Sequence, residues 1–305
     1  MDDSEREHIE KLVEEYTRRY RILETRRAKS GLETPASVII ELEDIQQEIG
    51  KINGRLQRGS IVTIDLMTFA GAVTTSGAQE RLGWSDRFQP TLPSRDIWSN
   101  ELLPQLEALK QQLALANHRV VAVRPKAHLS AGYAFGYVFR ETTGFHLWIE
   151  QAVRNTGQAQ WWRTDEPSAS GAPLELERAP GPSRAKRADT SVEISATPDV
   201  DIRASVTQAI QQLKLPIRQR IQFSLPTGTT VQNGPHALAM AQQVRSAIRK
   251  ARNDQPQQTI HLFGALPIGL AVLLGAQLNA CEPVQCYEFD RSINTYRPAC
   301  LLMPS

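Results

Sequence analysis

The sequence predicts an α/β protein in which two halves with mostly parallel sheets follow an α-helical hairpin. Three observations support this fold class. Residues 5–57 show only the helical spacing of apolar residues. From Gly59 onward, short β-branched runs alternate with helical stretches, as in βαβ units. Finally, the pattern of residues 101–151 recurs later in the chain at a constant spacing.

The composition is typical of a soluble globular protein of about two domains, with 305 residues, 41% hydrophobic and 22% charged. No run of 18 apolar residues occurs and the chain starts with acidic residues, so we expect a cytoplasmic protein with no membrane segment. The net charge of +2 argues against a duplex nucleic acid as partner. Cys281, Cys286 and Cys300 form no Cys-x-x-Cys pair and are expected to be small core residues.

Residues 1–58 are predicted to form the helical hairpin. Gly31 can adopt the left-handed cap of the first helix, and Thr34-Pro35 can begin the second. Two helices of this length bury little core alone, so we expect their apolar stripes to face another domain, subunit or protein. Those stripes are Ile9, Leu12, Val13, Tyr16, Tyr20 and Leu23, then Ile39, Leu42, Ile45, Ile49, Ile52 and Leu56.

The α/β region is predicted over 59–305. Its first half, 59–164, is expected to contain strands at 61–66, 119–123 and 144–149 and helices at 97–116 and 129–140. Residues 165–190 are rich in Pro, Gly and Ser, which is typical of a flexible linker. The second half, 191–305, is expected to contain strands near 192–197, 219–225, 259–263 and 284–289 and helices near 199–213, 234–252 and 267–278.

The two halves are interpreted as copies of one unit. A shift of 139 residues (275 − 136) pairs Gly136 with Gly275 and needs no gap from 101 to 151. A duplicated unit of this kind usually packs about a pseudo-twofold axis, so that equivalent loops converge. The alternative is chance similarity between two βαβ patterns. The same shift pairs Val123 with Leu262, Leu129 with Ile268, Trp148 with Tyr287 and Gln151 with Asp290.

The common enzyme motifs are absent: the chain has no P-loop, no Gly-x-Gly-x-x-Gly after a strand, no His-Glu-x-x-His and no Gly-x-Ser-x-Gly. The six histidines lack the spacing of metal ligands. We therefore expect a non-catalytic protein without a metal site or cofactor.

Loops at the carboxyl ends of parallel strands are the expected ligand sites of an open α/β sheet. The loop after strand 119–123 leads into a small-residue helix whose N-terminus, beside Lys126, suits a phosphate. In the equivalent loop of the second half, small residues let the backbone approach a ligand closely. Tight strand-to-helix packing is the alternative for both loops. The candidate residues are Lys126, His128, Leu129 and Ser130, and Phe263, Gly264, Ala265, Leu266 and Pro267.

Further candidates are polar and aromatic. Two further strand-end loops are candidates: the loop after strand 61–66, which contains Phe69, and the loop after strand 219–225. The second carries hydroxyl and amide groups that suit ribose, phosphate or base edges, or else it is a solvated turn. Indole rings beside a cation can stack nucleobases, with core packing as the alternative. These candidates are Phe69, Trp84, Trp161, Trp162, Arg163, Thr227, Thr229, Thr230 and Asn233.

An ordered set of segments resembles a known family. The segments are the helix ending in Gly136-Tyr137, residues 147–151 followed by Trp162, and residues 192–197, 262–267 and 287–290. On these segments, residues of about 60–305 resemble the SAVED domain of bacterial anti-phage (CBASS) and type III CRISPR-associated signalling proteins. The resemblance implies two fused Rossmann-like, CARF-like halves that bind a cyclic oligonucleotide, typically cyclic tri- or tetra-adenylate, in a shared pocket.

The resemblance also implies roles. Lys126 would pair with a phosphate, Trp84 and the Trp161–Arg163 segment would stack or clamp adenines, and the Thr227–Asn233 loop would hydrogen-bond ribose or base. Ligand binding would drive head-to-tail stacking into filaments that activate an effector. The hairpin resembles a helical adaptor, through 21–24 and 40–45, so we expect it to engage a separate effector protein. Two other functions stay open: a ring-nuclease-type phosphodiesterase that degrades the messenger, and a scaffold that assembles without ligand.

Overall fold

The computed structural model describes most of the chain in two units, Met1–Ile61 and Val62–Ser305. Each unit is considered by itself. The described residues are 3–30, 34–35, 37–42, 44–45, 48, 61–71, 77–152, 159–168, 171–185, 188–256 and 258–304.

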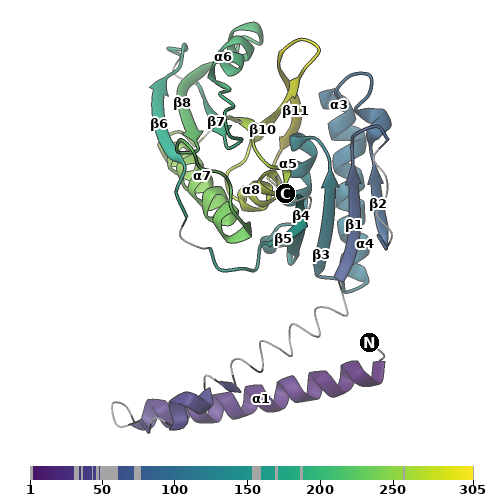
Figure 1. Cartoon of the computed structure of the whole chain (residues 1–305), viewed down its shortest axis with the longest axis vertical. Helices are drawn as coiled ribbons and strands as arrows, with labels where there is room; N and C mark the ends of the chain where they lie inside the picture. The colour runs from purple at the N-terminus through teal and green to yellow at the C-terminus, as the bar shows by residue number, and fades with distance from the viewer. Residues whose placement is uncertain are drawn as a thin grey trace. The chain divides into compact units, whose positions relative to one another are not determined.

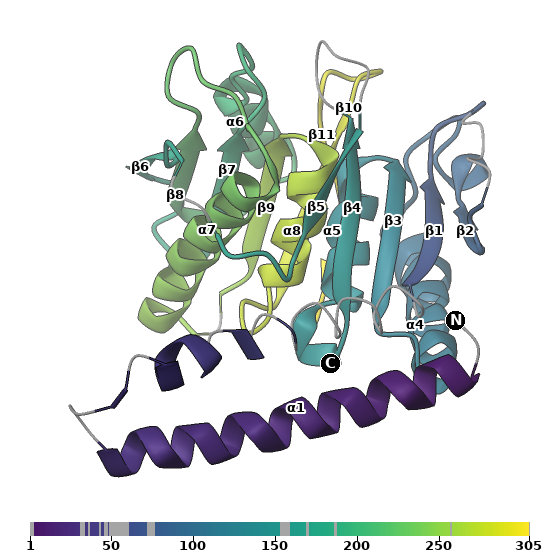
Figure 2. The ribbon, with the colours of Figure 1, turned by 60° about the horizontal axis from the view of Figure 1, so that its bottom comes forward.

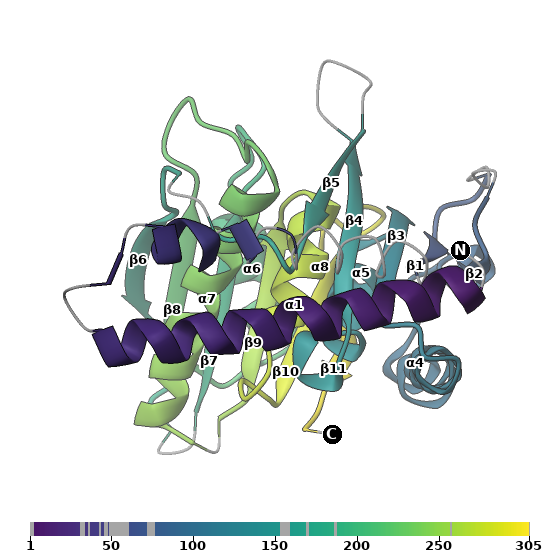
Figure 3. The same ribbon diagram turned by 90° about the horizontal axis from the view of Figure 1, so that it is seen from below.

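The N-terminal unit is helical. Helix α1 (Asp3–Ser30) is uninterrupted (Figure 3), and helical residues resume at 37–42. Leu23 of α1 is buried together with Leu42 and Ile45, and Arg19 forms an ion pair with Glu41. The described helical segments therefore pack against each other along the predicted apolar stripes. The predicted Gly31 cap and much of the predicted second helix lie outside the described residues.

The first half of the α/β unit is built on a five-stranded sheet of order β2-β1-β3-β4-β5 (Figure 1). β1 and β2 are parallel, as are β3 and β4, whereas β5 is an antiparallel edge strand. The elements are β1 (Ile61–Met67), β2 (Glu80–Gly83), the 3-10 turn η2 (Ser85–Arg87), α3 (Arg95–Ile97), the π-helical η3 (Trp98–Leu102), α4 (Leu103–Leu115), β3 (Val120–Lys126), α5 (Leu129–Val138), the 3-10 turn η4 (Glu141–Thr143), β4 (His146–Ala152) and β5 (Ala159–Arg163).

The second half is built on a six-stranded sheet of order β11-β10-β9-β7-β8-β6. Its four inner strands are parallel, and its two edge strands are antiparallel to their neighbours. The elements are β6 (Glu175–Pro180), β7 (Asp189–Ser195), α6 (Arg203–Gln212), β8 (Ile217–Ser224), α7 (Gly234–Asp254), β9 (Ile260–Ala265), α8 (Ile268–Gln277), β10 (Val284–Asp290) and β11 (Thr295–Leu302).

The predicted repeat corresponds to the structural repeat. A shift of 139 residues carries Leu129–Val138, which is α5, onto Ile268–Gln277, which is α8. Both helices are apolar on every side, as expected of helices that are buried all round. They pack against each other between the two sheets (Figure 2). The fold of two fused α/β halves with mostly parallel sheets is as predicted.

Two glycines let α5 and α8 approach closely. A Cβ atom at Gly136 would lie 2.0 Å from the Val272 carbonyl oxygen, and one at Gly275 would lie 2.3 Å from the Tyr133 carbonyl oxygen. The shift of 139 residues turns the first contact into the second, because it carries Gly136 onto Gly275 and Tyr133 onto Val272. The contact is therefore reciprocal, as at a twofold axis.

Helix α6 covers one face of the second sheet. This is the face that carries Phe263 and Tyr287, while α7 and α8 cover the opposite face. In the first half, the described residues between β1 and β2, which are 68–71 and 77–79, form no helix.

The structure corrects the expectation for 165–190. That stretch contains β6 and the first residues of β7, although its composition predicted a flexible linker. β6 pairs with β8 at the edge of the sheet, and five of its six side chains are exposed. An edge strand of this kind is held by backbone hydrogen bonds and needs no apolar run, so its composition does not distinguish it from a loop.

Candidate ligand-binding site

Both sheets reverse their strand order at a point that faces one cavity. In the first sheet the order reverses between β1 and β3, and in the second it reverses between β7 and β9. The carboxyl ends of strands at such a reversal form the usual binding crevice of an open α/β sheet. At the first reversal the ends lie side by side, because the Thr68 N–H donates to the Lys126 carbonyl oxygen at 3.1 Å.

The residues that follow these four strands line a cavity of about 770 Å³, which we call the shared cavity. Its volume is within the range of small-molecule sites, about 300–1,000 Å³. The first half contributes Phe69, Phe88, Pro90, Thr91, Leu92, Ala127, His128 and Leu129; the second contributes Thr197, Val200, Asp201, Ile202, Ser205, Gly264, Ala265, Leu266, Ile268, Glu288, Phe289, Asp290, Arg291, Ser292 and Tyr296.

An aromatic stack forms the first-half wall of the shared cavity. The His128 ring stacks on Phe88 with centroids 4.7 Å apart, and it contacts Phe69 at 4.5 Å with the two rings tilted by 37°. Phe69 is 46% exposed, so one side of the stack is open. A flat aromatic surface of this kind can receive a nucleobase or another planar group.

Thr68 fixes the His128 ring. The Thr68 hydroxyl oxygen accepts the His128 backbone N–H at 2.8 Å and lies 2.7 Å from His128 Nδ1. Burial, and secondly the charge of Arg291, lower the pKa of His128 to about 4, so the ring is neutral at pH 7. The Thr68 hydroxyl therefore hydrogen-bonds to Nδ1 of a neutral ring, as donor or acceptor according to the tautomer.

The second-half wall is charged. Asp201 is paired with Arg203 at 2.7 Å, and Asp290 is paired with Arg297 at 2.8 Å. Hydrogen bonds from Arg203 lower the pKa of Asp201, and a hydrogen bond from the Ser292 side chain lowers that of Asp290. Both carboxylates are therefore ionised and already have a cationic partner.

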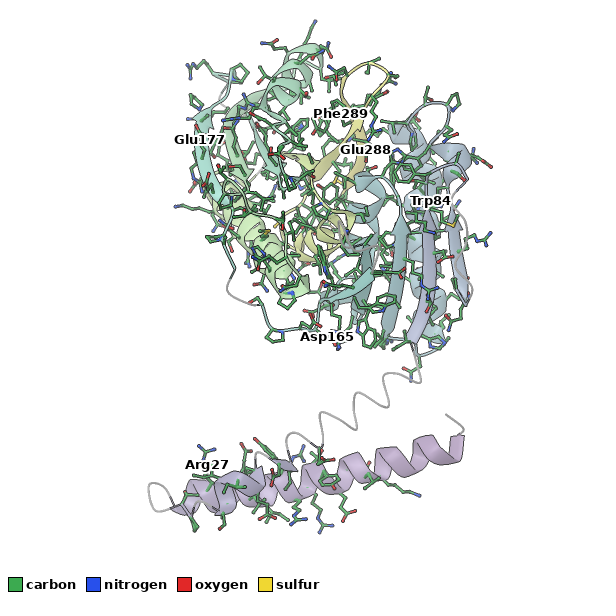
Figure 4. All side chains as sticks on the ribbon, in the orientation of Figure 1. Arg27, Trp84, Asp165, Glu177, Glu288 and Phe289 are labelled. Atoms are coloured by element: carbon green, nitrogen blue, oxygen red, sulfur yellow. The ribbon has the colours of Figure 1, made fainter. Side chains whose placement is uncertain are left out.

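Glu288 caps the helix that begins on the opposite half. Its Oε2 accepts the Ser130 backbone N–H at 2.8 Å, at the start of α5. The helix end that the sequence suggested for a phosphate therefore already receives a carboxyl group. Figure 4 shows Glu288 beside Phe289 near the middle of the α/β unit, away from Trp84, Asp165 and Glu177.

The equivalent helix end is capped in the same way by a neutral group. Gly269, which the 139-residue shift pairs with Ser130, donates its N–H to Gln151 Oε1 at 2.8 Å. Each of the two central helices is therefore capped by a side chain from a strand of the other half. These two caps join the halves on either side of the α5–α8 contact.

Six of the sequence-predicted residues meet at the shared cavity: Phe69, His128, Leu129, Gly264, Ala265 and Leu266. Ser130 is fully buried, and its backbone N–H is used by Glu288. Pro267 is the N-cap residue of α8. Lys126, the last residue of β3, is exposed and is not among the described residues that line the cavity.

Three predicted aromatic residues lie in the core. Trp84 is 3% exposed and donates its indole N–H to Gln105 Oε1 at 2.8 Å. Trp162 is buried against Gly234 and Gly269. Phe263 is buried and stacks on Tyr287 with ring centroids 4.2 Å apart. These positions support packing, which was the alternative for each residue.

The remaining predicted residues lie elsewhere. Arg163 is placed over the Trp148 ring at 4.4 Å and forms a two-bond pair with Asp165 at 2.8 and 2.6 Å. Trp161, on the edge strand β5, is exposed and does not line the shared cavity.

The threonine loop borders a neighbouring hollow of about 800 Å³, which has Thr197, Val200, Asp201 and Ile202 in common with the shared cavity. Thr227, Thr229 and Thr230 line it together with several acidic residues, which is unfavourable for a phosphate. Those acidic residues are Glu175, Glu177, Glu193, Asp199 and Asp201. Asn233 caps α7, because its Oδ1 accepts the His236 N–H at 2.9 Å.

Sequence reasoning missed Phe88, Glu288 and Arg291. The strand-end rule could have found Glu288 and Arg291, because they lie at and just beyond the end of β10. Phe88 lies beyond η2, and its place beside His128 depends on tertiary packing.

The described part of the chain contains no group of three or more His, Cys, Asp or Glu side chains placed to hold a metal ion. Among the described helices, none has both the length and the apolar character needed to cross a membrane.

Comparisons with known proteins identify similar sequences and folds. The sequence matches the family model of SAVED, the SMODS-associated and fused to various effectors sensor domain, over residues 105–302. No curated protein matches. The fold is similar to that of an Acinetobacter baumannii Cap4 SAVED/CARF-domain containing receptor with the cyclic trinucleotide 2'3'3'-cAAA, with a TM-score of 0.66 and 21% identity over 87% of this chain and 56% of that chain.

Two further structures give the same result. The A. baumannii receptor with 3'3'3'-cAAA has a TM-score of 0.64 and 19% identity, over 85% of this chain and 56% of that chain. A Moraxella osloensis Cap4 SAVED/CARF-domain containing receptor has a TM-score of 0.57 and 18% identity, over 85% and 54%. The chain thus spans just over half the length of these receptors and shares their fold.

Proposed function

Since the chain belongs to the SAVED family of sensor domains, we propose that it senses a cyclic oligonucleotide and binds it in the shared cavity. The observation that carries this proposal is the convergence of both strand-order reversals on one cavity with an aromatic wall. The cyclic trinucleotides named for the A. baumannii receptors support a ligand of the same chemical class.

The shared cavity offers the three kinds of contact that such a ligand needs. Phe69 offers an exposed aromatic face for a base. The neutral His128 ring is held by Thr68 through Nδ1, so its other nitrogen, Nε2, can hydrogen-bond to the ligand. Arg291 supplies a positive charge at the rim. The ligand is a cyclic oligoadenylate of three or four nucleotides, and the protein binds it without catalysing a reaction.

The test is ligand binding by a pair of exposed aromatic variants. Phe69 and Trp161 are 46% and 40% exposed, but only Phe69 lines the shared cavity. A thermal-shift screen against cyclic tri- and tetra-adenylates should show a raised midpoint for the wild type, because a ligand that binds only the folded state stabilises it. Calorimetry on the hit should show binding weakened about 5–150-fold by Phe69→Ala, the equivalent of 1–3 kcal/mol of stacking.

The control is Trp161→Ala, which should bind as the wild type does. Equal losses in both variants would place the site elsewhere, and no shift with any cyclic adenylate would overturn the proposal.

We further propose that ligand binding drives head-to-tail self-association and that the N-terminal unit recruits a separate effector. The family description, a sensor domain fused to various effectors, supports coupling to an effector. Within the N-terminal unit, Ile22 and Ile40 are 50% and 58% exposed and are available to a partner helix.

Light scattering with and without ligand tests self-association. Co-purification of a neighbouring-gene product by the wild type, lost in Ile22→Lys and Ile40→Lys, tests recruitment.

A further inference from the structure

Glu288 is the one carboxyl group among the described residues of the shared cavity that has no arginine partner. Asp201 and Asp290 are paired with Arg203 and Arg297, whereas Glu288 is held by the backbone N–H of Ser130. Glu288 is only 7% exposed. A buried anion without a countercharge is costly, and the positive end of α5 offsets only part of that cost.

The position of this carboxyl group is one that an incoming anion would favour. Helix N-termini bind phosphates through free N–H groups and the helix dipole. At the start of α5 this position is already occupied by the carboxyl group of Glu288, which also lines the cavity. A polyanionic ligand in the cavity would therefore meet a negative charge at a point where it would otherwise find a positive potential.

We propose that Glu288 occupies the phosphate position at the start of α5 and that an anionic ligand enters the shared cavity together with a proton taken up by this carboxyl group. The inference rests on the proposed function. Glu288 is thereby a specificity-determining residue, because it keeps ligand phosphates away from α5 and couples affinity to pH.

Among the ionisable groups around it, Glu288 has the pKa nearest to neutral pH. Burial raises the pKa of Glu288 to about 7, with the hydrogen bond from the Ser130 backbone N–H opposing the rise. His128 is neutral above pH 6, since its pKa is lowered to about 4. On α5 and β11, burial raises the pKa of Tyr133 and Tyr296, so both stay neutral.

The other charged or ionisable neighbours do not change state in that pH range. On β10, burial raises the pKa of Cys286, and on β11 the Cys300 thiol donates to the Ser130 carbonyl oxygen at 3.6 Å. Asp201 and Asp290 stay ionised because their pKa values are lowered. Of these cavity groups, Glu288 is therefore the one whose charge changes between pH 6 and 8 in the ligand-free protein.

The test is calorimetry of cyclic tri-adenylate binding in two buffers of different ionisation enthalpy, at pH 6.0 and pH 7.5. For the wild type, we expect uptake of at most about 0.75 proton per site at pH 7.5 and about 0.1 at pH 6.0, where Glu288 is already mostly protonated. Affinity should fall about tenfold between pH 6 and 8, since coupling to one proton changes affinity at most tenfold per pH unit. Glu288→Gln keeps an acceptor for Ser130 and should bind without proton uptake and with a flat pH profile.

The matched control is Gln151→Glu, which places a carboxyl group at the equivalent helix end outside the described lining of the cavity. Its proton uptake on binding should equal that of the wild type. Binding without proton uptake, or uptake that persists in Glu288→Gln, would overturn this inference and leave the proposed function standing. No binding heat in either buffer would overturn both. If Glu288→Gln does not fold, the wild type alone decides: proton uptake that does not rise from pH 6.0 to pH 7.5 would overturn the inference.

Discussion

Replacing Gly136 by alanine should force helices α5 and α8 apart. The added Cβ would lie 2.0 Å from the Val272 carbonyl oxygen and 2.9 Å from the Ala276 nitrogen, whereas ordinary contact begins at 3.4 Å. Both obstructing atoms belong to the backbone of α8 and cannot rotate away. The helices therefore have to separate by more than an ångström, or one of them has to bend.

The expected loss of stability follows from two opposing terms. Alanine is favoured over glycine inside a helix by about 1 kcal/mol. Overpacking of a core typically costs about 1–3 kcal/mol, and an overlap with helical backbone belongs at the upper end of that range. We expect a net loss of about 2 kcal/mol. In a domain of this size each kcal/mol lowers the thermal midpoint by about 2–4 °C, so the midpoint should fall by about 4–8 °C.

Urea unfolding followed by tryptophan fluorescence measures this loss, because Trp98 and Trp162 are buried in the same unit. The control is Gly83→Ala, whose Cβ would meet only Arg81 Cδ at 3.7 Å. This control should be close to wild type. A Gly136→Ala protein as stable as the Gly83→Ala protein would show that close approach of the two helices does not limit stability.

Gly275→Ala provides a further check on the reciprocal contact. Its Cβ would lie 2.3 Å from the Tyr133 carbonyl oxygen, so this variant alone should also lose stability. Once one alanine has separated the helices, the second has less to displace. The double variant should therefore lose less than the two single losses added together, by at least about 0.5 kcal/mol. Strict additivity would mean that the two contacts are independent.

Two further predictions concern buried charge and pH. In urea unfolding, Arg220→Met should lower the free energy of unfolding by about 3–5 kcal/mol, because the buried Glu193 (1% exposed) would lose its 2.6 and 2.7 Å hydrogen bonds from Arg220. The control Arg203→Met removes an exposed ion pair and should lower the free energy of unfolding far less. In the ligand-free protein, the lowered pKa of His128 removes stability as pH falls from 6.5 to about 4, whereas the raised pKa of Glu288 removes stability as pH rises from 4.5 to about 7. Relative to the wild type, the free energy of unfolding of His128→Gln should therefore fall as pH rises from about 4.5 to 6.5, and that of Glu288→Gln should rise. Equal pH slopes for the two variants would contradict these assignments.

Much of the fold could be predicted because its inner elements have strong sequence patterns. Each predicted strand and helix of the α/β region, from β1 to β10, has a counterpart in the structure. The four strands without a prediction, β2, β5, β6 and β11, are the four outer strands of the two sheets. An outer strand has one neighbour and needs no continuous apolar run, and β11 even contains Pro298.

The candidate site was predictable to the extent that the strand-end rule applies within one half. That rule identified Phe69, His128 and the Gly264–Leu266 loop, which do line the shared cavity. It could not show that Glu288 fills the start of α5, because Ser130 and Glu288 are 158 residues apart in the chain and belong to different halves. The position of Phe88 is likewise set by packing on His128.

The pseudo-symmetry of the fold does not extend to the chemistry of the shared cavity. The first half contributes the stacked rings of Phe69, His128 and Phe88, and the second contributes Glu288 and Arg291. The two helix caps also differ in charge, since a carboxyl group caps the start of α5 and an amide caps the start of α8. A ring-shaped ligand with several equivalent nucleotides would therefore meet the His128 aromatic cluster at one wall and charged groups at the other. A symmetric scaffold with asymmetric chemistry thus makes unequal contacts with nucleotides that are themselves equivalent.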